Sequence, residues 1–114
     1  MFKPPKDTDK FSWTKHAIEK MKFYGLSPQR VLRIVNKPER CEQAVVEGCL
    51  ACMQTVGKKR KTEIWMMYQD IIISGKKKRK IITAWRYPGV SPKRDMVPIP
   101  EEILKELGKV ISNQ

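Results

Sequence analysis

The feature that most constrains the fold is a series of strand-like segments separated by short loops that contain glycine. β-Branched, aromatic and other apolar residues dominate four stretches: residues 42–47, 49–56, 62–73 and 80–87. The breaks between them are Gly48, residues 57–61 and residues 74–78. Short glycine-containing loops between such segments are typical of β-hairpins. The sequence therefore predicts an antiparallel meander, in which Gly48 is either a break or a bulge within one longer strand.

Two helices are predicted before this region. Thr14 is a residue type that caps helix N-termini, and Gly25 suits the end of the helix that follows. Ser27 and Pro28 mark a second helix start, since proline fits the first helical position. Pro38 then disfavours helical geometry at the preceding residue and ends this helix. Residues 11–13, which precede the first helix, form either a short strand or a lead-in.

The order of these elements predicts an α+β fold. Residues 1–10 are polar and form a flexible arm, and residues 11–89 form one domain. In it, two N-terminal helices pack on one face of a twisted antiparallel sheet of about four strands. Residues 90–114 form a linker and a C-terminal helix opened by Pro100. Its apolar face comprises Ile103, Leu104, Leu107, Val110 and Ile111.

The charge of the chain indicates a polyanionic partner. Its 24 Lys and Arg residues against 12 Asp and Glu residues give a net charge of +12. Such an excess destabilises a compact state by self-repulsion unless opposite charge is bound. Phosphate backbones are the commonest polyanions, because neutralising phosphates releases condensed counterions. An anionic membrane surface and an acidic protein are the alternatives.

Apolar runs and cysteines bear on the compartment. No apolar run reaches the roughly 20 residues of a membrane-spanning helix, and the N-terminus lacks the apolar segment of a secretory signal. Three cysteines are an odd number, which argues against a disulfide framework and favours a reducing cytoplasm. Cys49 and Cys52 form a CxxC pair within a predicted strand, where positions three apart face opposite sides. With Cys41 they are expected to be inert thiols, and no metal or cofactor is implied.

Two clusters of basic residues carry much of the charge: Lys58, Lys59, Arg60 and Lys61, and Lys76, Lys77, Lys78, Arg79 and Lys80. Both are predicted at hairpin turns. Because one strand separates them, they should lie at opposite ends of the sheet and form a strip along it. Lysines at turns also discourage aggregation, which is the alternative explanation. Two clusters together with the net charge favour contact with a nucleic acid.

A second candidate feature is the sequence Trp85-Arg86-Tyr87 at the end of the last strand. In a strand, Trp85 and Tyr87 point to one face and Arg86 to the other. The guanidinium can clamp a phosphate, and an aromatic ring can stack on an unpaired base. On spacing alone, a core role for Trp85 and a solvated edge position for Arg86 are equally consistent.

His16 is the single histidine and follows Lys15 in the first helical turn. A neutral imidazole can act as a general base near pH 7, and a helix N-terminus favours nearby anions. The alternative is an ordinary half-exposed histidine at a helix start. Glu63 and Asp70 are too isolated in the sequence to indicate a paired-carboxylate site.

The stretch from Trp13 to Tyr87 resembles a family of small bacterial domains related to the RelE/ParE toxin superfamily. The resemblance rests on the phrase from His16 to Met21, then Tyr24-Gly25-Leu26-Ser27, Val31 and Pro38, although Lys20 stands where arginine is more usual. It implies two helices against a twisted antiparallel sheet. The ending from Trp85 to Gly89 and the C-terminal helix lie outside the resemblance.

The resemblance also implies candidate functions. RelE-like members cut messenger RNA on the ribosome without metal, whereas ParE-like members share the fold and cut nothing, so the fold does not decide the activity. For cleavage, His16 would transfer a proton, Arg86 and Lys15 would stabilise charge, and Tyr87 would orient a base. The expected partner is RNA or the ribosome. The alternatives are a non-catalytic nucleic-acid or ribosome binding module, and a protein-interaction module held by an acidic, antitoxin-like partner.

Overall fold

The computed structural model describes residues 2–44, 46, 48–91 and 97–112, with side chains described up to residue 107. Three helices and five strands follow the order β1 (Phe11–Trp13), α1 (Lys15–Tyr24), α2 (Pro28–Asn36), β2 (Arg40–Gln43), β3 (Cys49–Val56), β4 (Thr62–Ile73), β5 (Lys76–Pro88) and α3 (Glu101–Ser112). The fold is α+β, as predicted. The side chains of Val110 and Ile111, and residues 92–96 of the predicted linker, lie outside this description.

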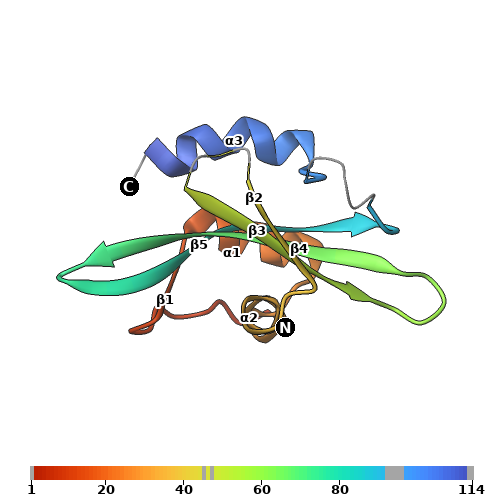
Figure 1. Cartoon of the computed structure of the whole chain (residues 1–114), viewed down its shortest axis with the longest axis horizontal. Coiled ribbons are helices and arrows are strands. Elements are labelled where there is room, and N and C mark those ends of the chain that lie inside the picture. Colours follow the sequence, from red (N-terminus) through yellow and green to blue (C-terminus); the bar gives the residue numbers. More distant parts are fainter. Residues whose placement is uncertain (1, 45, 47, 92–96, 113–114) are drawn as a thin grey trace.

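One mixed sheet of five strands, in the order β1-β5-β4-β3-β2, forms the centre of the molecule (Figure 1). Strands β2 to β5 are the predicted antiparallel meander. The expectation of a purely antiparallel sheet was wrong, because β1 pairs in parallel with β5, with Phe11 opposite Arg79. Gly48 lies in the turn between β2 and β3, and β2 is shorter and earlier than the predicted strand at residues 42–47.

Local capping explains why the first two helices begin and end where the sequence predicted. The Thr14 side chain accepts a hydrogen bond from the backbone N–H of Ala17, and that of Ser27 accepts one from Arg30. These bonds satisfy donors that a helix N-terminus leaves unpaired. Gly25 ends α1 at φ 69°, a left-handed conformation that favours glycine.

Helices α1 and α2 pack on one face of the sheet, as predicted, whereas the C-terminal helix α3 covers the other face (Figure 1). Ala17 of α1 and Ile34 of α2 pack with Ile64 and Met66 of β4 on one face. Ile103 and Leu107 of α3 pack with the other face, which β4 lines with its odd-numbered residues, Trp65 among them. The six residues from Glu63 to Tyr68 are all buried, which is typical of a strand covered on both faces.

Helix α1 also contacts α3 around the β5 edge of the sheet. Strand β1 pairs with β5 only over residues 11–13, and the following Thr14 Oγ1 donates to the Ile82 carbonyl. Beyond that point α1 runs beside β5, and Tyr24 Oη donates a hydrogen bond of 3.2 Å to Glu102 Oε1 on α3. In the predicted N-terminal arm, Phe2 packs against the core and the Lys10 carbonyl accepts from the Arg79 N–H.

The cysteines depart from the prediction. Cys41 and Cys52 are joined by a disulfide, because they lie directly opposite one another on β2 and β3. Directly opposite residues in an antiparallel pair bring their Cβ atoms close, and this register is not visible in the spacing of the CxxC motif. Cys49 faces the other side of the sheet, as predicted, and its free thiol has its pKa raised by burial. The argument from the odd number of cysteines to a reducing compartment therefore loses its basis.

Candidate nucleic-acid interface

The second basic cluster lies in a strand and not in a turn, contrary to the prediction. Ser74 and Gly75, both at positive φ, form the tight turn, and Lys76 to Lys80 are the first five residues of β5. In this segment Lys76 pairs with Ile73, and Lys78 pairs with Ile71. The five basic side chains are therefore held at fixed spacings along a ladder instead of on a loose loop.

Strand alternation divides this cluster between two faces. Ile81 packs in the core beneath α1 and α2. Because side chains alternate along a strand, Arg79 and Lys77 face the same side as Ile81. Lys80, Lys78 and Lys76 face the α3 side. On the first of these faces, Arg79 is fixed by an ion pair of its Nε with Asp70 Oδ1 at 3.3 Å, and it lies over the Tyr68 ring at 4.7 Å.

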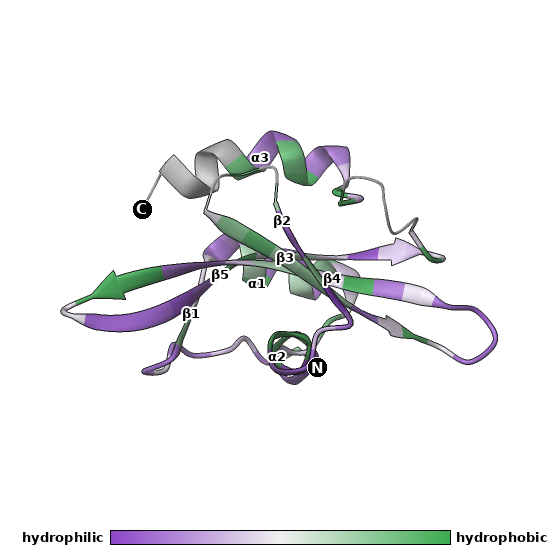
Figure 2. Cartoon of the chain, in the orientation of Figure 1, coloured by the Kyte–Doolittle hydropathy of each residue, from purple (hydrophilic) through white to green (hydrophobic). Residues whose placement is uncertain are grey.

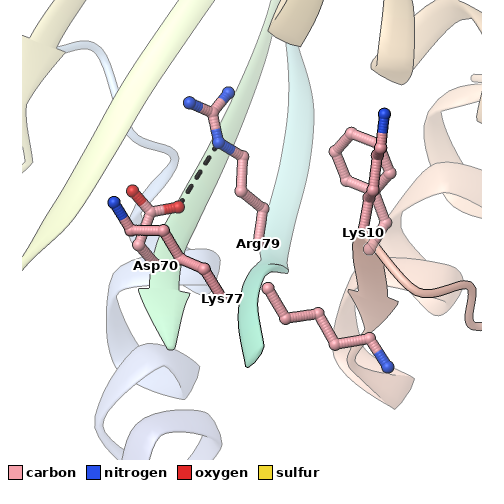
Figure 3. A pocket seen from close by; sticks show the side chains of 6 residues that line it. Lys10, Asp70, Lys77 and Arg79 are labelled. Atoms are coloured by element: carbon pink, nitrogen blue, oxygen red, sulfur yellow. Dashed lines mark ion pairs between the residues drawn. The ribbon is translucent and has the colours of Figure 1, made fainter. Parts of the chain in front are cut away.

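A cavity of about 290 Å³ opens beside Arg79, between β1 and the start of β5. Figure 3 shows Lys10 on the β1 side, and Lys77 beside the Arg79–Asp70 pair. Phe11 and Lys78 complete the lining. Three lysines and one arginine against a single carboxylate make this cavity suited to an anion such as a phosphate group.

The first basic cluster lies at the other end of the sheet. Lys58, Lys59, Arg60 and Lys61 are all exposed in the loop that joins β3 to β4. Gly57 makes this loop possible, because it adopts φ 100° and a Cβ there would lie 2.2 Å from the Arg60 carbonyl oxygen. The part of β4 from Thr62 to Gln69 separates the two clusters, which lie toward opposite ends of the sheet as the meander predicts (Figure 1).

His16 lies beneath α3 and not on the basic surface. Its Nε2 is 2.9 Å from Thr83 Oγ1 on β5, and its Nδ1 is 2.9 Å from Glu106 Oε2 on α3. Glu106 also pairs with Lys20, at 3.7 Å. A neutral imidazole that donates from Nδ1 to the carboxylate accepts the Thr83 hydroxyl at Nε2. His16 thereby joins α1, β5 and α3.

Burial determines the protonation state of His16. Desolvation, partly offset by Glu106 and Glu19 and reinforced by Lys20, lowers its pKa below the ordinary value of 6.5. Below pH 6.5 the unfolded chain therefore binds a proton that the folded chain resists. We expect the melting temperature to fall as the pH is lowered from 7.5 to 5.5, and the His16→Gln variant to lose part of this dependence. Equal dependence in the two proteins would contradict the expectation.

The other predicted catalytic residues do not gather around His16. Lys15 is exposed at the start of α1. Arg86 Nη2 donates to the Tyr24 carbonyl at the end of α1, a hydrogen bond of 3.4 Å. His16 and Tyr24 are eight residues apart, which is about 12 Å along a helix. Tyr87 lies on the opposite face of β5 from Arg86, against the core under α3. The catalytic roles of these four residues stay predictions.

Sequence reasoning missed the groups that hold His16. Thr83 is a polar residue within the buried apolar run of β5, and Glu106 precedes the buried Leu107 on α3. A buried hydroxyl in an apolar strand is a signal for a hydrogen-bond partner, because unpaired buried polar groups are strongly unfavourable. The partner could not be named, since Glu106 is 90 residues from His16 in the sequence.

Glu63 is a buried structural group. Glu63 Oε1 accepts hydrogen bonds from Trp65 Nε1 at 2.9 Å and from Ser91 Oγ at 2.6 Å. Its Oε2 accepts the Ser91 N–H at 2.9 Å. Ser91 Oγ also accepts from Arg40 Nη1. This network fixes the chain that leaves β5 against the α3 face of the sheet.

Searches of known proteins give no match to this chain among family models, curated proteins or solved structures. In the part of the chain that the structure describes, no three His, Cys, Asp or Glu residues are grouped to hold a metal ion. None of its helices there has the length and apolar character needed to cross a membrane.

Proposed function

We propose that this protein binds RNA through the two basic clusters at the ends of its sheet. The observation that carries the proposal is the disposition of their nine Lys and Arg side chains. Among the described residues, only Arg79 of these nine has an ion pair with a carboxylate. The other eight side chains therefore present positive charge that no ion pair with a described carboxylate neutralises.

The physical basis is the release of counterions from a phosphate backbone. Each phosphate that a lysine or arginine neutralises steepens the slope of log affinity against log salt concentration by about 0.7 to 0.9. Clusters at two separate ends fit an extended partner better than a small anion. The resemblance of the segment from His16 to Pro38 to RelE/ParE toxins supports RNA, or the ribosome that carries it, as the partner.

Binding is better supported than cleavage. Cleavage of RNA requires a base within hydrogen-bond reach of the 2′-hydroxyl, whereas His16 is buried and engaged with Thr83 and Glu106. Arg86 lies on the other face of the sheet from α3. Metal-independent cleavage thus stays a prediction that rests on the resemblance, and it needs α3 to move away from His16.

The proposal is tested by titrating the protein with ribosomal RNA at several salt concentrations between 50 and 200 mM. We expect affinity to fall steeply with salt. Replacing Lys58, Lys59 and Lys61 by alanine should reduce the slope of log affinity against log salt concentration by about two to three, and so should alanine at Lys76, Lys78 and Lys80. Folding of each variant is checked by thermal melting.

The matched control removes three exposed charges from the helices α1 and α2 and the residue that follows: Lys22, Arg33 and Lys37. This control should leave the slope nearly unchanged. Salt-independent binding, the absence of binding, or an equal effect of all three variants would each overturn the proposal.

A further inference from the structure

The hairpin formed by β4 and β5 extends beyond the strands on either side of it. Pairing of β3 with β4 ends at Cys49 and Gln69, and pairing of β1 with β5 ends at Phe11 and Arg79. From there to the turn at Ser74, the two strands pair only with each other. We call residues 70–79 the hairpin extension. Beyond Arg79, its three remaining residue pairs project about 10 Å from the sheet.

The two strands of the hairpin extension differ in character. On β4 it carries Ile71, Ile72 and Ile73, of which Ile72 is 74% and Ile73 is 49% exposed. Its β5 strand carries four basic residues. Figure 2 shows this contrast as a hydrophobic end of β4 beside a hydrophilic start of β5. Ile73 shares the α3 face with Lys76, whereas Ile72 shares the opposite face with Lys77. An isoleucine exposed in a projecting two-stranded segment adds little to a core, so the exposure of Ile73 points to a contact outside the chain.

On the face toward α3, the hairpin extension and the next pair form an ordered surface. Lys76, Lys78 and Lys80 succeed one another at alternate positions, about 7 Å apart. Ile73 and Ile71 lie opposite the first two of them. A row of lysines at this spacing can follow successive phosphates of one strand, while the isoleucines contact the sugars between the strands.

The chemistry of this surface favours a double helix over a single strand. Proteins that bind single strands stack the bases on exposed aromatic rings. Among the described residues, the only large aromatic side chain with high exposure is Phe23 on α1, whereas Tyr68 beside the hairpin extension is buried beneath Arg79. A double-stranded RNA, by contrast, is recognised by its phosphates and 2′-hydroxyls across a wide and shallow minor groove.

We propose that the hairpin extension binds double-stranded RNA across its minor groove, with Lys76 and Lys78 on the phosphates and Ile73 on the sugars. This proposal rests on the proposed RNA binding and deepens it by naming a duplex and the face that contacts it. Lys77, Arg79 and Ile72 lie on the opposite face and take no part in the duplex contact.

The test compares affinities for a 20-base-pair RNA duplex (about one and a quarter times the span of a typical double-stranded RNA-binding domain), the same sequence as single-stranded RNA, and the DNA duplex. The wild-type protein should bind the RNA duplex best. The Lys76→Ala/Lys78→Ala variant should bind it about tenfold more weakly or worse, because two phosphate contacts are lost. The Ile73→Ser variant should reduce the preference for the duplex while leaving the salt slope unchanged.

The matched control is Lys77→Ala against Lys78→Ala, because these neighbours carry equal charge on opposite faces of one strand. We expect Lys78→Ala to weaken duplex binding more than Lys77→Ala. Equal effects, tighter binding of the single strand, or equal binding of the DNA duplex would overturn the duplex proposal while leaving RNA binding intact. A protein that binds none of the three fails at the proposed function itself.

Discussion

Replacing Trp85 by alanine is expected to lower the free energy of unfolding by about 3 to 5 kcal/mol, the usual range for a buried large aromatic residue. Trp85 is fully buried in the core under α3. Its ring is stacked on Trp65, with centroids 5.9 Å apart and planes within 1° of parallel. Chemical denaturation of the wild-type protein and the variant measures the difference.

The same variant separates the two roles that the sequence allows for Trp85. A core residue changes stability, and RNA affinity persists at temperatures where the variant is folded. A base-stacking residue changes RNA affinity and leaves stability alone. Phe23→Ala is the control, because Phe23 is 70% exposed, and it should change the unfolding free energy by no more than about 0.5 kcal/mol. A stable Trp85→Ala variant that no longer binds RNA would refute the core role.

The second large effect is expected for Glu63→Leu. This change leaves the Trp65 Nε1 and the Ser91 N–H without their acceptor inside the protein. An unsatisfied buried donor is unfavourable by about 1 to 3 kcal/mol, so the expected loss of unfolding free energy is about 2 to 4 kcal/mol. Thermal and chemical denaturation measure it.

Two further variants test the origin of that loss. Glu63→Gln keeps one acceptor oxygen and should be less destabilising than Glu63→Leu. Glu39 provides the control, because this exposed carboxylate accepts two hydrogen bonds from Thr55, at its N–H and its Oγ1. Water can replace those bonds, so Glu39→Leu should lower stability by less than about 1 kcal/mol. If Glu63→Leu proved no more destabilising than Glu39→Leu, the buried network would not be a stabilising element.

Features of the fold that depend on neighbouring residues could be predicted from the sequence. The caps at Thr14 and Ser27, the end of α1 at Gly25 and the hairpin between β4 and β5 are of this kind. The position of Cys49 and Cys52 on opposite faces of the sheet was also predicted, because it depends only on the alternation of side chains along a strand.

Features that depend on distant segments were missed. The parallel pairing of β1 with β5 joins residues nearly 70 positions apart. The Cys41–Cys52 disulfide depends on the register of β2 against β3. The position of α3 had a signal that was not used: the continuous apolar run from Ile64 to Tyr68 predicts a strand covered on both faces.

In the candidate site, too, features set by neighbouring residues were predicted and features set by distant segments were missed. The separation of the two basic clusters follows from the meander and was predicted. The burial of His16 was not, because α3 and Glu106 come from the other end of the chain. A histidine at a helix start has the same local sequence whether it faces solvent or lies beneath another helix.

The length of β4 sets the distance between the two basic clusters. Lys61 precedes Thr62 at one end of β4, and Lys80 pairs with Gln69. The seven steps from Thr62 to Gln69 therefore separate the nearest residues of the two basic clusters by about 24 Å along the strand. A polyanion shorter than this reaches one cluster only, whereas a longer one engages both and gains from the second contact the advantage of an intramolecular binding event. For the proposed RNA binding, the sheet thus sets a minimum partner length, independent of nucleotide sequence, below which the two ends act as separate weak sites.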